Sequence, residues 1–487
     1  MTTTTLNPEA VGGSTQLLIG GRWMDASDGR TFTVHDPANG EVIAVVADAS
    51  VVDGLAAVGA AHDALPAWAA TPPRQRGEVL RRTFELMTER SDELARLIVR
   101  ENGKALSDAR GEVTYAAEFF RWFAEEAVRA GGDLQTAPSG TNRILVIRQP
   151  IGVSVLVTPW NFPAAMATRK IGPALAAGCT VVLKPASDTP LTALVMGAIL
   201  CDAGVPAGVV NILPSRRSGA VVGAMLHDPR VRKLSFTGST AVGRGLLHEA
   251  ADCVVNCSME LGGNAPFIVF DDADLESAVA GAMVAKMRNG GEACTAANRF
   301  LVQRGIAAEF GARLAQTMGT LRVGPGLEDG VQLGPLINAA GRDKVALLVD
   351  GAVSDGARIT VGGSIPDGPG FFYPPTVLVD VPPTAAILRE EIFGPVAPLV
   401  VFDTEEEAVK LANDSEYGLI AYVYTRDLQR GLRFSEALES GMVGLNRPIV
   451  SDPAAPFGGV KQSGLGREGG HDGILEFLES KYIAVTW

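Results

Sequence analysis

One apolar run that ends in a proline-bracketed turn, GVSVLVTPWNFP at residues 152–163, decides the fold of this chain. The run Gly152–Thr158 predicts a buried strand, and Ala164–Ala177 predicts the helix that follows it. Three more strand and helix pairs come next, and the four strands begin at 152, 180, 209 and 233, about 24–29 residues apart. This spacing is close to the βαβ period, so we predict a parallel sheet with helices on both faces.

Polar or flexible residues stand where three of these strands end. Asn161, Lys184 and Gly238 fall at or just past the ends of the strands Gly152–Thr158, Thr180–Lys184 and Lys233–Thr237 respectively. Sheets of this kind bind ligands at the carboxyl ends of their strands. We therefore expect a ligand site at this edge of the sheet.

The regions on either side of this repeat predict further α/β structure. Short strands and turns are expected over Leu17–Val46, and helices over Val51–Arg129, where apolar residues recur at spacings of three and four. After residue 260 a second α/β region is expected to run to about Val443, with a strand at Phe267–Phe270, a helix at Leu275–Arg288, a strand at Phe300–Gln303 and mostly loop over Asp350–Pro375.

Three segments have sequence patterns that do not predict α/β structure of this kind. Residues 1–16 are Thr-rich and predict a disordered tail. Arg143–Arg148 predicts a strand that is too exposed for a core position, because arginines flank it. The apolar end, Tyr482–Trp487, predicts an edge strand, and an exposed edge strand can pair with another subunit.

The composition indicates a globular protein of two or three domains. The chain has 487 residues, of which 47% are hydrophobic and 20% charged. The net charge of −13, with no basic stripe, makes nucleic acid an unexpected partner. Five irregularly spaced cysteines argue against a disulfide framework, and neither a signal peptide nor a membrane span is evident. We therefore expect a cytoplasmic protein that binds neither membranes nor a metal.

The chemistry is predicted from a segment of small residues around one cysteine. Cys294 lies in Asn289–Arg299, which contains two glycines and three alanines, so a substrate could approach the thiol closely. Thirty-four residues earlier, Glu260 stands before a Gly-Gly bend, and Asn161 stands in the turn described above. A thiol nucleophile, a carboxylate base and an amide donor are the groups needed for chemistry through a thioester.

These motifs, in this order, resemble those of the aldehyde dehydrogenase superfamily, most closely its succinate-semialdehyde dehydrogenase branch, from about Leu18 to the last residue. The resemblance implies an α/β fold with a Rossmann-type cofactor domain, an α/β catalytic domain and a β ribbon through which a homodimer or homotetramer forms. The corresponding boundaries are 17–130 and 152–258 for the cofactor domain, 259–446 for the catalytic domain and 131–151 with 475–487 for the ribbon, while 447–474 returns to the cofactor domain as a substrate loop.

The resemblance also implies a nicotinamide cofactor. Lys184 would contact the adenosine ribose, and Ser187 stands where NAD-preferring members often have a glutamate. A serine leaves room for a 2′-phosphate, and Arg216 and Arg217 could add positive charge, so we expect NADP rather than NAD. Alternatively, Ser187 caps the next helix and both arginines are solvated. The other expected cofactor contacts are Thr158, Pro159, Trp160, Gly238, Ser239, Gly243, Leu261, Glu391 and Phe393.

Each chemical group receives a role from this resemblance. Cys294 is the expected nucleophile, and Asn161 the donor to the oxyanion, although an asparagine there could also simply cap a helix. Glu260 would activate water, which points to hydrolysis and a carboxylic acid product, because members that pass the acyl group to phosphate or coenzyme A generally lack it. Glu292 replaces a common glutamine and should point away from the thiol.

The substrate is expected to carry a distal carboxylate. Arg169, Arg288 and Ser451 match the residues that hold the carboxylate of succinate semialdehyde in the resembling branch, and Arg447 could favour a longer semialdehyde such as glutarate semialdehyde. If the arginines only form structural ion pairs, the protein is instead a broad-specificity or aromatic aldehyde dehydrogenase. A non-catalytic protein that keeps the fold is the alternative from another class.

Overall fold

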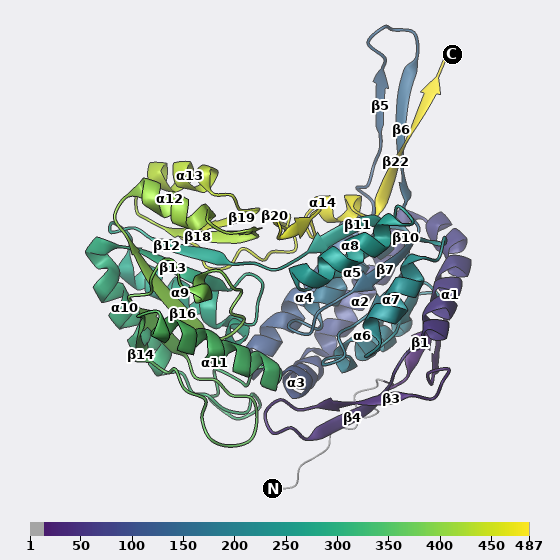
Figure 1. The fold of residues 1–487 in the computed structure, drawn as a ribbon. Helices are drawn as coiled ribbons and strands as arrows, with labels where there is room; N and C mark the ends of the chain where they lie inside the picture. Colours follow the sequence, from purple (N-terminus) through teal and green to yellow (C-terminus); the bar gives the residue numbers. More distant parts are fainter. Residues whose placement is uncertain (1–13, 487) are drawn as a thin grey trace.

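A computed structural model describes residues 14–486, which form two lobes with a ribbon rising from one of them (Figure 1). An eight-stranded sheet, in the order β2-β1-β9-β8-β7-β10-β11-β21, is the centre of the first lobe. A seven-stranded sheet, in the order β14-β15-β16-β13-β12-β18-β19, is the centre of the second. Both sheets have helices on their faces, so the predicted α/β fold is confirmed.

The predicted strand and helix repeat forms the parallel middle of the first sheet. Every residue of its first three strands is buried, which explains their nearly continuous apolar sequence. Antiparallel strands complete the two edges, and one of them comes from near the end of the chain. The strands are β7 Val153–Val157, β8 Thr180–Lys184, β9 Val210–Ile212, β10 Val231–Thr237, β11 Asn256–Glu260, β1 Leu17–Ile19, β2 Arg22–Met24 and β21 Gly464–Leu465.

Helices cover both faces of this sheet, as predicted. The helices between its strands are α5 Ala165–Ala177, α6 Leu191–Asp202, α7 Ser218–Leu226 and α8 Thr240–Ala251. The amino-terminal region adds α1 Val51–Ala70, α2 Pro73–Glu89, α3 Ser91–Asn102 and α4 Leu106–Glu126, together with the hairpin β3 Thr31–His35 and β4 Val42–Ala47. None of the helices within residues 14–486 is both long and apolar enough to cross a membrane.

The second sheet is parallel except at one edge. There β14 pairs antiparallel with β15, so the prediction of mostly loop over residues 350–375 is wrong for residues 350–354 and 358–361. Its strands are β12 Ala265–Val269, β13 Ala297–Gln303, β14 Arg358–Val361, β15 Thr376–Val379, β16 Val396–Phe402, β18 Ile420–Tyr424 and β19 Met442–Leu445. Its helices are α9 Leu275–Met287, α10 Arg304–Gly319, α11 Ala339–Ser354, α12 Glu405–Asn413 and α13 Leu428–Ala437. The short elements β20 Val460–Lys461 and α14 Asp472–Leu475 lie on the chain that returns to the first lobe, and β20 pairs with β17 Tyr417–Gly418, which precedes β18.

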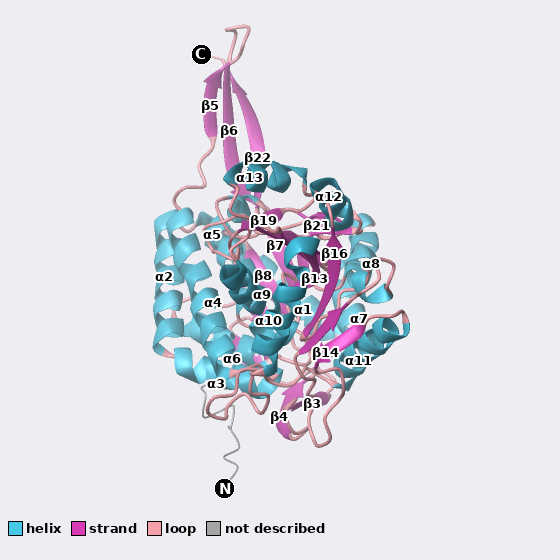
Figure 2. Cartoon of the chain, turned by 90° about the vertical axis from the view of Figure 1, so that its left-hand side faces the viewer, coloured by secondary structure: helices cyan, strands magenta, loops and turns pink. Residues whose placement is uncertain are grey.

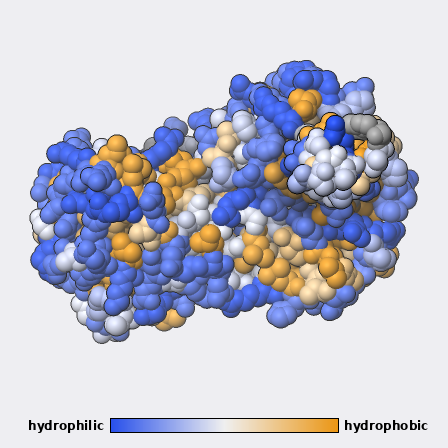
Figure 3. Space-filling view, turned by 90° about the horizontal axis from the view of Figure 1, so that it is seen from above, coloured by the Kyte–Doolittle hydropathy of each residue, from blue (hydrophilic) through white to orange (hydrophobic). Residues whose placement is uncertain are grey.

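The ribbon consists of β5 Asp133–Thr136, β6 Arg143–Pro150 and β22 Leu478–Val485, and it stands clear of the body (Figure 2). Strand β22 forms one edge of it, which confirms the predicted edge strand over residues 482–485; Trp487 lies outside the described residues. The side chains of Leu134 and Tyr482 are 68% and 58% exposed. Figure 3 looks down on the molecule from the side on which the ribbon rises, and it shows hydrophobic patches between hydrophilic side chains.

The predicted tail, residues 1–16, lies only partly within the described residues. Residues 1–13 lie outside the described residues, but residues 14–16 are placed against the first lobe. The carbonyl oxygen of Thr15 accepts a hydrogen bond of 2.9 Å from the amide of Ala47, at the end of β4. The prediction of disorder is therefore wrong for residues 14–16, because this hairpin provides a partner that the local sequence does not reveal.

Candidate active site

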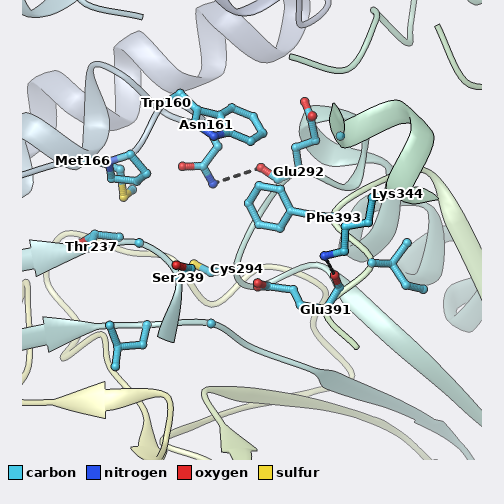
Figure 4. A pocket seen from close by; sticks show the side chains of 16 residues that line it. Trp160, Asn161, Met166, Thr237, Ser239, Glu292, Cys294, Lys344, Glu391 and Phe393 are labelled. Atoms are coloured by element: carbon cyan, nitrogen blue, oxygen red, sulfur yellow. Dashed lines mark hydrogen bonds between the residues drawn. The ribbon is translucent and has the colours of Figure 1, made fainter. Parts of the chain in front are cut away.

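A cavity of about 280 Å³ lies at the carboxyl ends of β7 and β10, where the two lobes meet (Figure 4). Its lining comes from the turn after β7, the start of α8, the loop after β11, the cysteine segment and the segment before β16. The predicted site residues in this lining are Pro159, Trp160, Asn161, Gly238, Ser239, Leu261, Cys294, Glu391 and Phe393. Thus one cavity collects residues that are far apart in the sequence.

The segment before Cys294 has an unusual backbone. Asn289, Gly290 and Gly291 all have positive φ, with values of 54°, 61° and 79°. Glycine adopts this conformation without steric cost, and asparagine tolerates it better than most residues. A side chain at Gly291 would also collide with the carbonyl oxygen of Gly394. The turn therefore needs small residues for two separate reasons, and it places the thiol in the cavity.

Two buried amides hold this turn in place. The side chain of Asn161 donates to the carbonyl oxygen of Glu292 over 3.1 Å. The side chain of Asn289 donates to the carbonyl oxygens of both Glu292 and Asn161, each over 2.9 Å. Asn161 precedes α5 and does not cap it. Since its amide carries two hydrogens, a second donor remains beside the cavity.

The Cys294 thiol is electrostatically disfavoured as a thiolate. Burial, together with the charges of Glu391 and Glu260 and against those of Arg169 and Arg288, raises its pKa to about 12. The free thiol is therefore protonated at neutral pH, and it must lose its proton before it can attack a carbonyl.

Glu292 lines the same cavity, but its carboxyl group points away from the thiol, as predicted (Figure 4). The carboxylate accepts a hydrogen bond of 3.1 Å from the amide of Ile337. Burial raises the pKa of Glu292 to about 8, so the group is mostly neutral at pH 7. A neutral acid at this position does not repel a thiolate.

Glu260 ends β11 and is buried next to this cavity rather than in its lining. One carboxylate oxygen, Oε2, has no hydrogen-bond partner within residues 14–486. Burial raises the pKa of Glu260 well above its usual value, and the charge of Glu468 raises it further, against Arg169, Lys170 and Arg467. A buried carboxyl with a raised pKa has the properties of a general base that works near neutral pH.

Beside Glu260, two cations of α5 share a single carboxylate. Arg169 pairs with one oxygen of Glu468, and Lys170 pairs with the other. Lys170 also donates to the hydroxyl of Ser235 over 2.9 Å. The guanidinium of Arg169 lies 4.2 Å from the centre of the Phe457 ring. Arg169 is therefore in a buried ion pair, the alternative that the sequence left open, and no local sequence signal identified Glu468 as its partner.

A second cavity, of about 240 Å³, contains two of the three predicted substrate residues. Arg288 and Ser451 line it together with the aromatic residues Tyr115 and Phe162. The guanidinium of Arg288 lies 5.1 Å from the centre of the Phe162 ring. Arg169 is not in this lining, but its charge acts on the hydroxyl of Tyr115, and hence it lies close behind the cavity wall.

Arg447, which the sequence associated with substrate length, is not in the lining of either cavity. Its side chain donates to the carbonyl oxygen of Ile449 over 2.9 Å. Ile449 does line the second cavity. Arg447 therefore shapes the loop at the cavity rather than placing its charge inside it.

The other side of the first cavity has the features of a nucleotide site. The rings of Trp160 and Phe393 meet edge to face with centroids 5.4 Å apart. Burial raises the pKa of Glu391 to about 7, and its carboxylate accepts a hydrogen bond of 3.1 Å from the amide of Gly263. Lys344, which the sequence did not single out, donates to the carbonyl oxygen of Glu391 over 2.6 Å and also lines the cavity.

The glycine turn after β10 is closely packed. A side chain at Gly238 would collide with the ring of Phe236, and one at Gly243 would collide with Leu261. Ser239 is the N-cap of α8 and accepts a hydrogen bond from the amide of Val242. The start of α8 thus faces the cavity, and a helix start attracts anions such as a pyrophosphate.

Ser187 lies in a separate cavity of about 210 Å³, which Arg216 also lines. Ser187 does not cap α6, because the carboxylate of Glu101 accepts from the first two amides of that helix. Arg217 pairs with Asp28 instead of facing this cavity.

Three further predicted cofactor residues lie behind these linings. Thr158 follows β7, and its amide donates to the carbonyl oxygen of Lys184 over 3.2 Å. Lys184 is buried, and burial lowers its pKa to about 8. Gly243 is one turn inside α8 and contacts the cavity only through Leu261. These residues support the walls of the cavities rather than lining them.

A family model for the aldehyde dehydrogenase family matches residues 23–483, nearly the whole chain. The chain belongs to the aldehyde dehydrogenase family. Its fold is that of solved aldehyde dehydrogenases as well, so the resemblance seen in the motifs extends over both lobes and the ribbon.

Individual relatives of this aldehyde dehydrogenase are similar over their full length. A succinate-semialdehyde dehydrogenase of Paenarthrobacter nicotinovorans is 56% identical, over 91% of this chain and 99% of that protein. A glutarate-semialdehyde dehydrogenase of Pseudomonas putida is 51% identical, over 97% of this chain and 98% of that protein. The crystal structure of an NADP-dependent enzyme of E. coli superimposes with a TM-score of 0.97 at 50% identity, over 99% of this chain and all of the other.

Proposed function

We propose that this aldehyde dehydrogenase oxidises a semialdehyde with a distal carboxylate, succinate or glutarate semialdehyde, to the dicarboxylic acid. The observation that carries the proposal is the pairing of two cavities, one with a thiol and an amide donor and one with Arg288 and Ser451. Relatives with these two activities, each about half identical to this chain over nearly its full length, support the same substrate class.

The chemistry begins at the thiol. Cys294 releases its proton to water, and its thiolate adds to the aldehyde carbon, which gives a thiohemiacetal with a negative oxygen. The free hydrogen of the Asn161 amide and the backbone N–H of Cys294 donate to that oxygen. A bound nicotinamide would supply the hydride acceptor for this carbon, and Cys294 would then hold the acyl group as a thioester.

Hydrolysis completes the reaction. Glu260 takes a proton from water as the water oxygen adds to the thioester carbon, the C–S bond then breaks, and the carboxylic acid leaves. The buried position and unpartnered oxygen of Glu260 support this role, because a base with a raised pKa takes protons well near neutral pH.

The residues of this chain fit an NAD(P) cofactor. The tight turn at Gly238, the start of α8 and the Trp160–Phe393 pair form a cradle, and the turn has no room for a side chain at Gly238 beside the ring of Phe236. We propose NADP rather than NAD, because Ser187 and Arg216 line one cavity and could both contact a 2′-phosphate. Arg217 takes no part, since Asp28 pairs with it.

A second candidate function has an observation in its favour. The ion pair of Arg169 with Glu468, and the aromatic rings of Tyr115 and Phe162, also suit a broad-specificity or aromatic aldehyde dehydrogenase. In that case Arg288 alone would leave little preference for a carboxylate.

The ribbon supports a homodimer or homotetramer. Its edge strand β22 has unpaired backbone groups on one side, and its exposed Leu134 and Tyr482 offer apolar surface to another copy. The proposed domain boundaries follow the same division into two sheets and a ribbon.

Initial rates of nicotinamide reduction test the substrate and the cofactor together. Succinate semialdehyde and butanal have the same number of carbons, but only the first has a carboxylate. We expect kcat/KM to favour succinate semialdehyde by at least about 2 kcal/mol, roughly thirtyfold, with NADP preferred to NAD. An equal or better rate with butanal supports the second candidate instead, and the Arg288→Ala variant should reduce the preference only if the clamp exists.

A further inference from the structure

Arg169 lies between a buried carboxylate and the wall of the second cavity. On one side it pairs with Glu468, and on the other its charge acts on Tyr115, which lines the cavity with Arg288 and Ser451. Its guanidinium is 1% exposed, so water does little to screen its charge. A carboxylate that enters the second cavity would therefore draw on the same cation that neutralises Glu468.

Glu468 does not depend on Arg169 alone for its position. Its other oxygen pairs with Lys170, which Ser235 in turn holds through a hydrogen bond. If Arg169 interacted with a substrate carboxylate and its ion pair with Glu468 became weaker, Glu468 would stay in place and remain ionised. Arg169 would then compensate less of the negative charge of Glu468, and the groups next to Glu468 would experience more of that charge.

Glu260 is the neighbour that this change would affect. The charged and titratable groups that act on it are Glu468, Arg169, Lys170 and Arg467, and its own charge acts on Cys294. Among the cations in this group, Arg169 also acts on Tyr115 in the wall of the second cavity, as does the carboxylate of Glu468. The side chain of Arg169 therefore connects the substrate's far end with the base.

We propose that Arg169 interacts with two carboxylates in turn, first that of Glu468 and then that of the substrate. A carboxylate-bearing acyl group in the second cavity weakens the ion pair between Arg169 and Glu468, and Glu260 thereby becomes a stronger base. This inference rests on the proposed semialdehyde substrate and adds a role for its distal carboxylate in hydrolysis. A plain alkyl acyl group leaves the Arg169–Glu468 pair intact, and its thioester is hydrolysed by a weaker base.

The sign of the effect follows from the charges. Arg169 lowers the pKa of Glu260, and Glu468 raises it. A substrate carboxylate beside Arg169 offsets the positive charge of Arg169, and it leaves the negative charge of Glu468 less compensated. Both changes raise the pKa of Glu260. The acid side of the pH profile for thioester hydrolysis should therefore lie at higher pH for the succinyl enzyme than for the butyryl enzyme, by roughly 0.5–1 pH unit.

Decay of the acyl-enzyme measures this step directly. The enzyme with NADP is mixed with a limiting amount of succinate semialdehyde or butanal and quenched after set times. Mass spectrometry of the intact protein then gives the fraction that still carries the acyl group, at pH values from about 5.5 to 9. A higher midpoint for the succinyl enzyme supports the proposal. Equal midpoints, with a preserved preference for the semialdehyde in kcat/KM, overturn the coupling alone, whereas loss of that preference overturns the proposed substrate.

Two variants separate Arg169 from a direct effect of the substrate's charge. Arg169→Gln should raise the midpoint for the butyryl enzyme and remove most of the difference between the two acyl groups, while Arg169→Lys, which keeps the charge, should preserve it. Arg288→Gln is the matched comparison, because Arg288 lines the second cavity but is not among the main charges acting on Glu260. A difference that persists in Arg169→Gln would assign the effect to the substrate alone and overturn the role of Arg169.

Discussion

Different forces hold the nucleophile and the base of this site in place. On the side of Cys294, the amides of Asn161 and Asn289 donate to backbone carbonyl oxygens over 2.9–3.1 Å. On the side of Glu260, Arg169 and Lys170 balance the charge of Glu468 in the buried interior. The first arrangement depends on geometry, and the second depends on the balance of charges.

This difference predicts two kinds of response to substitution. Neutral amides do not titrate, so changes around Cys294 should alter rates without moving the pH profile. Changes among buried charges should move the profile, because each charge shifts the pKa of the others. The predictions below use this contrast, from the largest expected effect to the smallest.

The largest effect is expected for Cys294→Ala. Without a thiol no thioester forms, so turnover of aldehyde should fall by at least about 10³-fold, while the fold and nucleotide binding persist. Initial rates and cofactor fluorescence titrations measure both properties. Cys201→Ala is the control, since that exposed cysteine lies away from the cavity. Substantial remaining turnover would show that another group is the nucleophile.

The two amides should differ from each other. Asn161→Ala removes the proposed oxyanion donor and should reduce kcat by about 10²–10³-fold. Asn289→Ala removes the support of the turn and places an alanine at positive φ, but it removes no donor to the substrate, so we expect a smaller loss, roughly tenfold, with an unchanged pH profile.

The control for both amides is Asn211→Ala. Asn211 is also a buried amide that donates twice to backbone carbonyls, but it lies in β9, away from the cavity. This variant should lose stability and keep kcat. If Asn211→Ala reduces kcat as much as Asn289→Ala, the effect on turnover is general rather than a property of the turn.

The smallest effect is expected for Glu292→Gln. Because the pKa of Glu292 is raised from 4.5 to about 8, the folded state loses stability as pH rises from the lower value through the higher one. Glutamine does not titrate and can still accept from Ile337. The variant should match the wild type near about pH 5 and be more stable near about pH 9, by about 2–4 kcal/mol or a few degrees in Tm.

Thermal unfolding of both proteins at the two pH values measures this difference directly. Other titrating groups cancel, since both proteins contain them. A difference in Tm that is the same at both pH values would mean that Glu292 does not change its charge in this range.

Much of the fold could be predicted from local patterns. The strand and helix repeat after Gly152 has a clear period, and each of its elements is confirmed within a few residues. The short strand β14 was missed, because its pairing with β15 supplies the stability that its glycine-rich surroundings lack. Residues 14–16 were missed for the same reason, since their partner is the hairpin of β3 and β4.

The amino-acid sequence by itself determined the order of the strands and helices, the family, and the residues around Cys294, because these depend on spacing and on conformations that few residues tolerate. Only the tertiary structure decided that Arg169 pairs with Glu468, that Tyr115 and Lys344 line the cavities, and that Ser187 stands with Arg216 instead of Arg217. Such contacts join side chains up to about three hundred positions apart, such as Lys170 and Glu468 at 298 positions, and no local pattern records them. The physical reason is that burial makes each charge depend on whichever partner the fold brings beside it.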